Sequence, residues 1–369
     1  MRQYKSIDIH AHILPEETMR RLQKEVPSLA LKLKSIDERS DILEIAGVTQ
    51  KPFPREAWDL ELRLQDMDKS QVDIQLLSNT PQTFLYEQEA SLGAACAEIQ
   101  NDQIASLVRK QPDRFLGLAT LPMQAPERAA QELRRAMASL GLLGFHLASN
   151  IQGRNLDDPD LEPVWEAAQA LGAFVLVHPF KIAAGERLKS YYLKNLIGNP
   201  LDTTIAAASL IFGGVIERYP AISFCFAHGG GFVPYQAGRF IHGWKVRPEP
   251  KQFLGDGPAK SLGRIYYDTI LHSGAALKFL IDSVGASHVL LGSDYPFDMG
   301  YYDGVRQVRS LSIPEGDQNL ILGDTAKVLL GNVSKGRIRL PSAGQEKSSG
   351  SFPSRSSSPP SSPARKGNS

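Results

Sequence analysis

Short runs of apolar and β-branched residues recur along the chain as far as residue 296. Their length and their content of Val, Ile, Phe and Tyr predict short buried strands. The runs cover residues 6–13, 72–79, 115–122, 142–150, 174–179, 222–230, 265–272 and 289–296.

Between these runs, apolar residues recur every three or four positions, which is typical of helices that bury one face. Several of these patterns end at Gly or Pro, where a helix is expected to stop. The predicted helices cover residues 60–71, 91–112, 126–141, 161–172, 203–220 and 274–285. Strands that alternate with helices predict an α/β fold with a parallel sheet, most simply closed as a (β/α)₈ TIM barrel.

An open doubly wound sheet is the alternative fold for this alternation. Such a sheet is expected to carry a glycine-rich phosphate loop after its first strand, whereas the first strand here ends in His-Ala-His. The barrel is therefore favoured. Residues 14–59 form an insertion after the first strand, on the side where active-site loops lie, and are expected to be a partial lid.

Composition divides the chain near residue 340. Residues 1–340 are predicted to form one barrel domain. Residues 341–369 are rich in Ser and Pro and are predicted to be a disordered tail without a catalytic role.

Charge and cysteine content narrow the choice of partner and compartment. The chain has 41 basic and 40 acidic residues, and it has no long basic block, so neither nucleic acid nor a membrane surface is expected as a partner. Cys96 and Cys225 are far apart in sequence and support no disulfide framework or sulfur-rich metal site. With no signal sequence and no run of 18 apolar residues, the expected location is the cytoplasm.

Polar residues with metal-binding chemistry recur at the carboxyl ends of the predicted strands. They are His10, His12, His178, His228, His272 and Asp294. The carboxyl ends of barrel strands converge on one mouth, so these residues are expected to become neighbours despite their separation in sequence.

The His10 and His12 pair is the strongest part of this metal signal. Side chains alternate along a strand, so both imidazoles point to the same side. Imidazoles with one carboxylate and an open position for water suit Zn²⁺ best, and Fe²⁺, Co²⁺ or Mn²⁺ are alternatives. The fourth predicted strand offers no lysine or glutamate to bridge a second metal, so one ion per subunit is expected. His146 in that strand is interpreted as a packed core histidine.

Four motifs appear in order along the chain: IDIHAHILP, FVLVHPF, CFAHGGGFVPYQAGR and LLGSDYPF. With these motifs the sequence resembles the amidohydrolase superfamily, in particular its decarboxylase branch. The resemblance implies that His10, His12, His178 and Asp294 hold the zinc ion. It also implies that His228 is the acid/base residue beside the metal-bound water.

The resemblance further implies substrate-binding residues and a homodimer. Arg239 matches an arginine that reaches across the dimer to a substrate carboxylate, and Phe297 matches an aromatic wall. Arg247 is a second arginine of the same kind. The place of another arginine in the insertion falls at Lys51 or Arg55, without a unique alignment. His272 is expected either to contact substrate or to support a ligand.

The activity implied is the non-oxidative decarboxylation of a small carboxylate, without an organic cofactor. The substrate implied is 2-amino-3-carboxymuconate-6-semialdehyde or a close analogue. Three alternatives remain: decarboxylation of a 2-hydroxybenzoate such as 6-methylsalicylate or γ-resorcylate, a metal-dependent hydrolase or hydratase, and a catalytically silent barrel that acts as a binding module.

Overall fold

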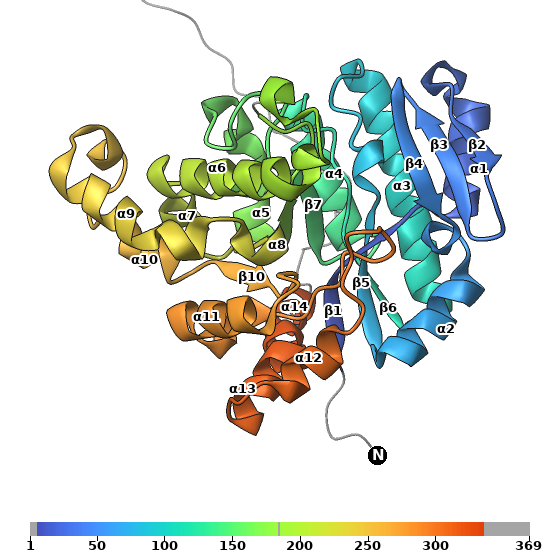
Figure 1. Cartoon of the computed structure of the whole chain (residues 1–369). Helices are drawn as coiled ribbons and strands as arrows, with labels where there is room; N and C mark the ends of the chain where they lie inside the picture. The colour runs from blue at the N-terminus through green and yellow to red at the C-terminus, as the bar shows by residue number, and fades with distance from the viewer. Residues whose placement is uncertain (1–5, 184, 336–369) are drawn as a thin grey trace, which may run out of the picture. The chain divides into compact units, whose positions relative to one another are not determined.

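The strands of this computed structural model, which describes residues 6–183 and 185–335, form a closed parallel barrel (Figure 1). The barrel strands are β1 (Ile7–Ile13), β5 (Ile74–Asn79), β6 (Phe115–Gly117), β7 (Gly144–Ala148), β8 (Phe174–His178), β9 (Ser223–Phe226), β10 (Tyr266–Asp268) and β11 (Val289–Leu290). Each pairs in parallel with its neighbour from β1 to β6 and from β7 to β11.

Backbone hydrogen bonds at two seams close the barrel. Between β6 and β7, Ala119 N donates to Gly144 O at 2.8 Å, and between β1 and β11, Ile9 N donates to Leu291 O at 2.8 Å. The predicted TIM barrel is therefore confirmed, and the alternative of an open doubly wound sheet is wrong.

Helices surround the barrel in the alternating order predicted from the sequence (Figure 1). The larger helices are α2 (Leu60–Ser70), α3 (Ala90–Lys110), α4 (Pro126–Ala138), α5 (Glu162–Leu171), α6 (Asn199–Phe212), α9 (Val233–Val246), α11 (Gly274–Val284) and α14 (Thr325–Lys335). The shorter ones are α7 (Val215–Arg218), α8 (Ala227–Gly230), α10 (Pro258–Leu262), α12 (Gly304–Ser310) and α13 (Glu315–Asn319).

Local chemistry sets where several helices begin and end. The Asp59 side chain accepts hydrogen bonds from the first backbone N–H groups of α2, and α5 ends at Gly172 in a left-handed conformation. The helix predicted over residues 203–220 is instead two helices, α6 and α7. The break falls at Gly213 and Gly214, where Gly214 has a φ of 72° that a helix does not allow.

The insertion after β1 folds as a small unit of its own. It contains α1 (Glu16–Glu25) and an antiparallel sheet of β2 (Lys32–Ser35), β3 (Ser40–Ile45) and β4 (Val48–Pro54). Its buried side chains, such as Leu22, Leu43 and Phe53, form a separate cluster that also includes Leu85 and Ile99. The insertion is thereby packed beside the loop after β5 and the helix α3.

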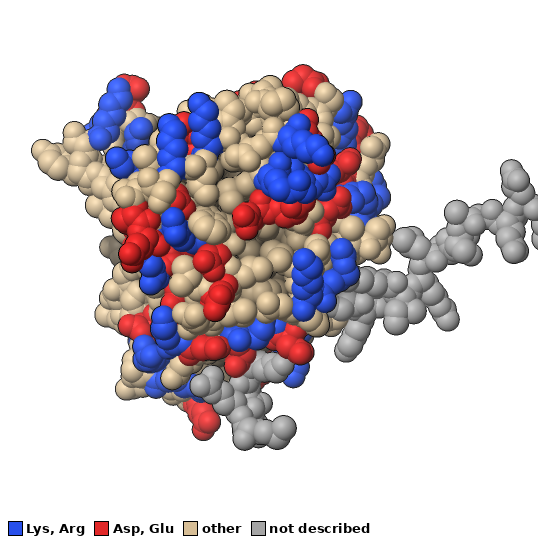
Figure 2. Space-filling model, turned by 90° about the vertical axis from the view of Figure 1, so that its right-hand side faces the viewer, with Lys and Arg blue, Asp and Glu red and all other residues tan. Residues whose placement is uncertain are grey.

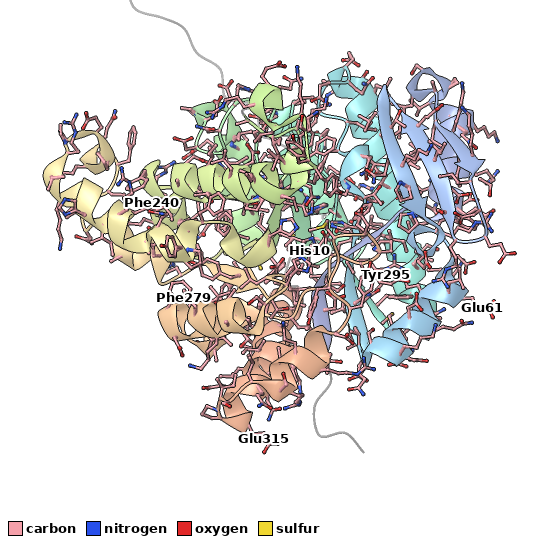
Figure 3. All side chains as sticks on the ribbon, viewed as in Figure 1. His10, Glu61, Phe240, Phe279, Tyr295 and Glu315 are labelled. Carbon is pink, nitrogen blue, oxygen red and sulfur yellow. The ribbon has the colours of Figure 1, made fainter. Side chains whose placement is uncertain are left out.

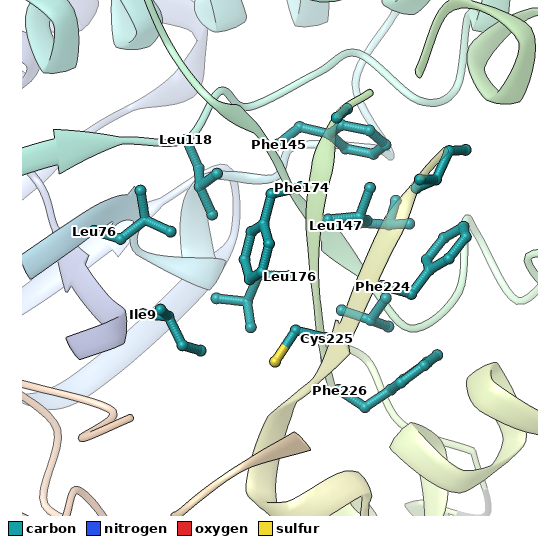
Figure 4. Close-up of a cluster of buried hydrophobic side chains, with 14 of the residues drawn as sticks. Ile9, Leu76, Leu118, Phe145, Leu147, Phe174, Leu176, Phe224, Cys225 and Phe226 are labelled. Carbon is teal, nitrogen blue, oxygen red and sulfur yellow. The ribbon is translucent and has the colours of Figure 1, made fainter. Parts of the chain in front are cut away.

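Apolar side chains from neighbouring strands fill the barrel and the layer beneath the helices (Figure 4). Trp165 of α5 is fully buried between Phe145 and Phe224, with ring centroids 6.4 and 5.7 Å away. Burial of such large side chains is the main source of stability in a domain of this kind. The barrel is thus a packed core, with room for chemistry only at its mouth.

The chain divides into two units, Met1–Arg337 and Ile338–Ser369. The predicted disordered tail, residues 341–369, lies outside the described residues.

Basic and acidic side chains are interspersed on the face shown in Figure 2. Over residues 6–183 and 185–335, no helix combines the length and the apolar character needed to cross a membrane.

Several strands are shorter than predicted at the mouth of the barrel. The runs 222–230 and 289–296 end as strands at Phe226 and Leu290. The first continues as the short turn α8, which has non-helical backbone angles at His228 and Gly229, and the rest of the second is irregular. These segments contain His228 and Asp294, which have φ values of 57° and 56°. The sequence pattern shows apolar character but not this change of backbone geometry.

Candidate metal centre and active site

The strand β1 supplies the first two residues of the site. His10 and His12 are fully buried. His10 lies at a register irregularity in the pairing of β1 with β5, and His12 lies just beyond it. Figure 3 shows His10 in the interior of the barrel, well separated from Phe240 on α9. The predicted convergence of strand ends is therefore realised in the structure.

Four of the predicted residues bring their ligand atoms within 4.8 Å of one another. Oδ1 of Asp294 lies 3.0 Å from Nε2 of His12 and 3.3 Å from Nε2 of His10. Nε2 of His178 is 3.7 Å from the same oxygen. Among the described residues, Nε2 of His178 and Oδ1 of Asp294 are buried and make no hydrogen bond. Three imidazoles and a carboxylate at this spacing fit one divalent cation.

The pKa values of His12 and His178 in the metal-free chain agree with such a site, whereas His10 has to lose a proton when a cation binds. Burial lowers the pKa of His12 to about 4 and that of His178 to about 3, so both imidazoles are neutral at pH 7. Burial also opposes the charged form of His10, but Asp268 and Asp294 outweigh it and raise the pKa of His10 to about 10. Burial opposes ionisation of Asp294 too, yet the surrounding histidines hold its pKa well below the usual range.

Each ligand histidine has a second partner at its other ring nitrogen. Nδ1 of His10 lies 2.7 Å from Oδ2 of Asp268, and Nδ1 of His12 lies 3.1 Å from Oγ of Ser78. Nδ1 of His178 is 2.9 Å from the carbonyl oxygen of Pro179. Such partners fix the ring orientation and direct Nε2 to the common point, as is usual for metal-binding histidines.

A buried arginine supports the backbone of the site. Arg63 of α2 is fully buried and donates to the carbonyls of His12 and Glu56 and to the Gln75 side chain. Its guanidinium lies 4.7 Å from the ring centroid of Tyr295, next to Asp294 in sequence. Burial lowers the pKa of Arg63 to about 10, so it remains charged at pH 7. Arg63 thus joins the strand and the loop that carry metal ligands.

His228 lies beside the cluster on the turn after β9. Its Nε2 is 3.4 Å from Oδ2 of Asp294, and its ring centroid is 5.3 Å from that of His178. Its side chain is 15% exposed, whereas that of His10 has no exposure. A histidine that adjoins the cation site and is reached by solvent is suited to exchange protons with a bound molecule.

A cavity of about 580 Å³ opens over the cluster. His178 and Asp294 form its floor, and Gln50 of β4 and Gln82 belong to its wall. The loop after β8 contributes further wall residues, namely Phe180, Lys181, Tyr192, Lys194 and Asn195. The insertion therefore does reach the mouth, as expected for a partial lid.

Phe297 and Lys51, both predicted to contact substrate, differ in their relation to the cavity. Phe297 lines it, with its ring centroid 5.4 Å from that of His12. Lys51 is exposed, and its neighbour Gln50 faces the cavity instead, because side chains alternate along β4.

The other three predicted substrate residues lie outside this cavity. His272 is exposed and contacts the ring of Tyr301, and Arg239 is exposed on α9. Arg247 forms a surface ion pair with Glu249. Within one chain, the structure does not bring these three side chains to the metal cluster, and their roles remain predictions.

His146 is buried, as interpreted from the sequence, but it lies next to the ligands. Its ring centroid is 5.1 Å from that of His12 and 4.6 Å from that of Phe84. Burial, with the nearby histidines, holds its pKa well below the usual range, so the ring is neutral. Neither ring nitrogen has a hydrogen-bond partner in the described chain.

Sequence reasoning missed Asp268 and Ser78, which contact ring nitrogens of the cluster, and Arg63, which donates to the backbone carbonyl of His12. One signal was available: Asp268 is a carboxylate near the end of an otherwise apolar predicted strand. Arg63 gives no such signal, because it is one charged residue in a helix that contains several.

Comparison with known proteins identifies the family. A family model described as amidohydrolase matches residues 7–331. The chain belongs to the amidohydrolase family. This amidohydrolase is 37% identical over 335 residues to 2-amino-3-carboxymuconate-6-semialdehyde decarboxylase of Dictyostelium discoideum, covering 88% of this chain and 91% of the relative. It is 28% identical over 351 residues to the protein of the same name from Caenorhabditis elegans, covering 80% and 86%.

A solved structure extends the comparison to the fold of the amidohydrolase. The 5-carboxyvanillate decarboxylase of Novosphingobium aromaticivorans, complexed with manganese, matches with a TM-score of 0.76 and 23% identity, covering 89% of this chain and 96% of that one. The predicted membership in the decarboxylase branch is thereby confirmed by the sequence relatives, and the barrel by the structure.

Proposed function

We propose that this amidohydrolase is a zinc-dependent, non-oxidative decarboxylase of 2-amino-3-carboxymuconate-6-semialdehyde or a close analogue. The observation that carries the proposal is the cluster of His10, His12, His178 and Asp294, two of whose members line the floor of a cavity, with His228 beside it. Two relatives that span most of the chain carry the name of this decarboxylase, and their similarity supports the choice of substrate.

The chemistry of the cluster supports one ion per subunit. When bound there, a divalent ion supplies a Lewis acid that activates water and stabilises negative charge on a substrate. Zinc is proposed because three imidazoles and one carboxylate suit it, and manganese is the alternative because the solved relative carries it.

His228 is proposed to move the proton. In the reaction, a proton adds to the substrate carbon that bears the carboxylate, and this breaks the conjugation of the substrate. The bond to the carboxyl group then breaks, its electron pair returns to the conjugated system, and CO₂ leaves. The position of Nε2 of His228, 3.4 Å from Oδ2 of Asp294, places a proton donor and acceptor at the edge of the cluster.

A homodimer is proposed to complete the substrate site. Arg239 is exposed on α9, and the neighbouring Tyr235 is 77% exposed, with its ring near that of Phe279, which is 47% exposed. Exposed aromatic side chains of this kind favour a protein interface. In this proposal, Arg239 holds a substrate carboxylate in the site of a second copy, and Arg247 is a further cation of that kind.

Mass spectrometry of the products tests the reaction class. The zinc-loaded full chain is expected to release CO₂ from the muconate semialdehyde, and more slowly or not at all from 6-methylsalicylate and γ-resorcylate. A product that has gained water instead would favour a hydrolase or hydratase. A panel with no turnover at all would favour a binding module.

The variant His228→Asn tests the proton transfer. It is expected to bind one zinc ion per chain and to lose CO₂ release, because the ligand set is intact and the proton donor is absent. Full activity in this variant would overturn the assignment.

Mixing inactive His228→Asn with inactive Arg239→Ala is expected to restore part of the activity if Arg239 acts across the dimer, and no restoration would refute that role.

A further inference from the structure

The end of β10 carries a carboxylate for which the proposed mechanism has no use. We propose that Asp268 is a positioning residue that sets the orientation of the metal ligand His10 and the turn that carries His228. The part that concerns His228 rests on the proposed function, whereas the part that concerns His10 rests on the geometry of the ligand cluster.

Asp268 has no exposed surface and uses both carboxylate oxygens. Oδ2 lies 2.7 Å from Nδ1 of His10 and accepts from the backbone N–H of His228 at 2.9 Å. Oδ1 accepts from the backbone N–H of Gly229 at 2.7 Å and from that of Ile270 at 3.1 Å. One side chain therefore contacts both functional elements.

The bond to His10 decides where its other ring nitrogen points. When Nδ1 keeps its proton and donates to Asp268, Nε2 is the ring nitrogen that can give up its proton and bind a cation, 3.3 Å from Oδ1 of Asp294. The space for this pair is small: a Cβ added at Gly292 would lie 2.9 Å from Cβ of Asp268 and 3.1 Å from Cβ of His10. Gly292 therefore packs closely against both side chains, and a larger residue there would press on this contact.

The bonds to the turn hold an unfavourable backbone conformation. His228 has φ 57° and ψ 48°, a left-handed region that costs a non-glycine residue conformational free energy. The N–H groups of His228 and Gly229 both point to Asp268, which offsets that cost. Nδ1 of His228 makes no hydrogen bond in the described chain, so the ring is positioned by the backbone of the turn and by the contact of its Nε2 with Asp294.

A carboxylate is required at this position, because all four partners of Asp268 are donors when His10 binds a cation through Nε2. An amide of the same shape would place an NH₂ group against two N–H groups in either orientation. Asp268→Asn therefore changes the hydrogen bonding with almost no change in volume, which makes it a sharp test.

The test compares Asp268→Asn with Glu132→Gln in the full chain. Glu132 is a buried carboxylate of α4 that accepts from Asn101 and Arg135. Asp268→Asn is expected to lower zinc affinity, measured by competition with a chelator, by about 10- to 100-fold. It is also expected to change the visible spectrum of the Co²⁺-loaded protein. At saturating zinc, kcat for CO₂ release is expected to fall about tenfold or more, with KM nearly unchanged. Glu132→Gln is expected to lower the melting temperature without moving these readouts.

A second measurement uses the wild-type chain, in case Asp268→Asn does not fold. In zinc-loaded protein with ¹⁵N-labelled histidine, His10 is expected to show a downfield Nδ1–H that exchanges slowly with solvent. Its absence would overturn the contact, as would unchanged zinc affinity and kcat in a folded Asp268→Asn. If the wild type decarboxylates nothing, the proposed function fails, while zinc affinity, the Co²⁺ spectrum and the NMR signal still decide the role of Asp268 toward His10.

Discussion

The floor and the rim of the cavity are built in different ways. In the floor region, here the cluster of His178 and Asp294 with His10 and His12 buried beneath them, the rings of His10 and His12 are each held at Nδ1 by a second side chain. On the rim, Tyr192 is 52% exposed, and Lys194 is exposed with no ion pair in the described residues. The floor is fixed by strand pairing and burial, whereas the rim depends on loops.

This difference separates reaction class from substrate choice. A cation site needs ligand atoms fixed within a few tenths of an ångström, which buried strands and second hydrogen bonds provide. Substitutions of exposed polar side chains at the rim have little effect on the fold. Changes to the floor are therefore expected to abolish metal binding or folding, and changes to the rim to alter substrate affinity.

The largest effect is expected from Asp294→Asn on the floor. The amide removes the only anionic ligand of the cluster, so zinc affinity is expected to fall more than about 100-fold in chelator competition. Asp298→Asn is the matched control, because Asp298 lines the same cavity but is not part of the cluster. Its side chain accepts a long hydrogen bond of 3.5 Å from the hydroxyl of Tyr192. Similar losses in both variants would contradict the distinction between floor and rim.

Arg63→Met is expected to have the next largest effect, on stability. The change leaves the buried carbonyls of His12 and Glu56 without their donor, which is expected to lower the free energy of unfolding by about 3 kcal/mol. Urea unfolding of the metal-free chain measures this loss of unfolding free energy. Arg154→Met, which removes partly exposed ion pairs, should cost much less. Equal losses of unfolding free energy in the two variants would show that Arg63 does not stabilise the chain more than a surface arginine does.

A smaller effect is expected from Lys194→Ala at the rim. Loss of a cation that faces the cavity is expected to raise KM for a carboxylate substrate about tenfold and to leave kcat within a factor of about two. Steady-state kinetics of CO₂ release measure both constants. Lys189→Ala is the control, since Lys189 is in the same loop but pairs with Glu186. An unchanged KM in Lys194→Ala would remove this lysine from the substrate site.

The sequence predicted the floor well, because its signals are local and repeated. His10 and His12 stand two positions apart on one strand, and His178 and Asp294 end or follow other strands, so barrel topology alone brings them together. The second partners were harder to predict. Ser78 and Asp268 contact ligands that are distant in sequence, and no spacing indicates such a pair.

The rim could not be predicted from spacing for a physical reason. Loops have no periodicity that assigns a face, so the resemblance to the family could not decide between Lys51 and Arg55, whereas the pleat of β4 turns Gln50 to the cavity. The insertion showed no clear strand pattern, and its sheet of β2, β3 and β4 became visible only in the structure. The proposed role of Arg239 depends on a second copy, which a single chain does not contain.

Titration of the metal-free full chain with Zn²⁺, followed by CO₂ release from the muconate semialdehyde, tests the central claim most directly. Activity is expected to be absent at the start and to rise linearly until one equivalent of zinc per chain has been added. Full activity without metal, or a break at two equivalents, would contradict a single cation held by three histidines and one aspartate.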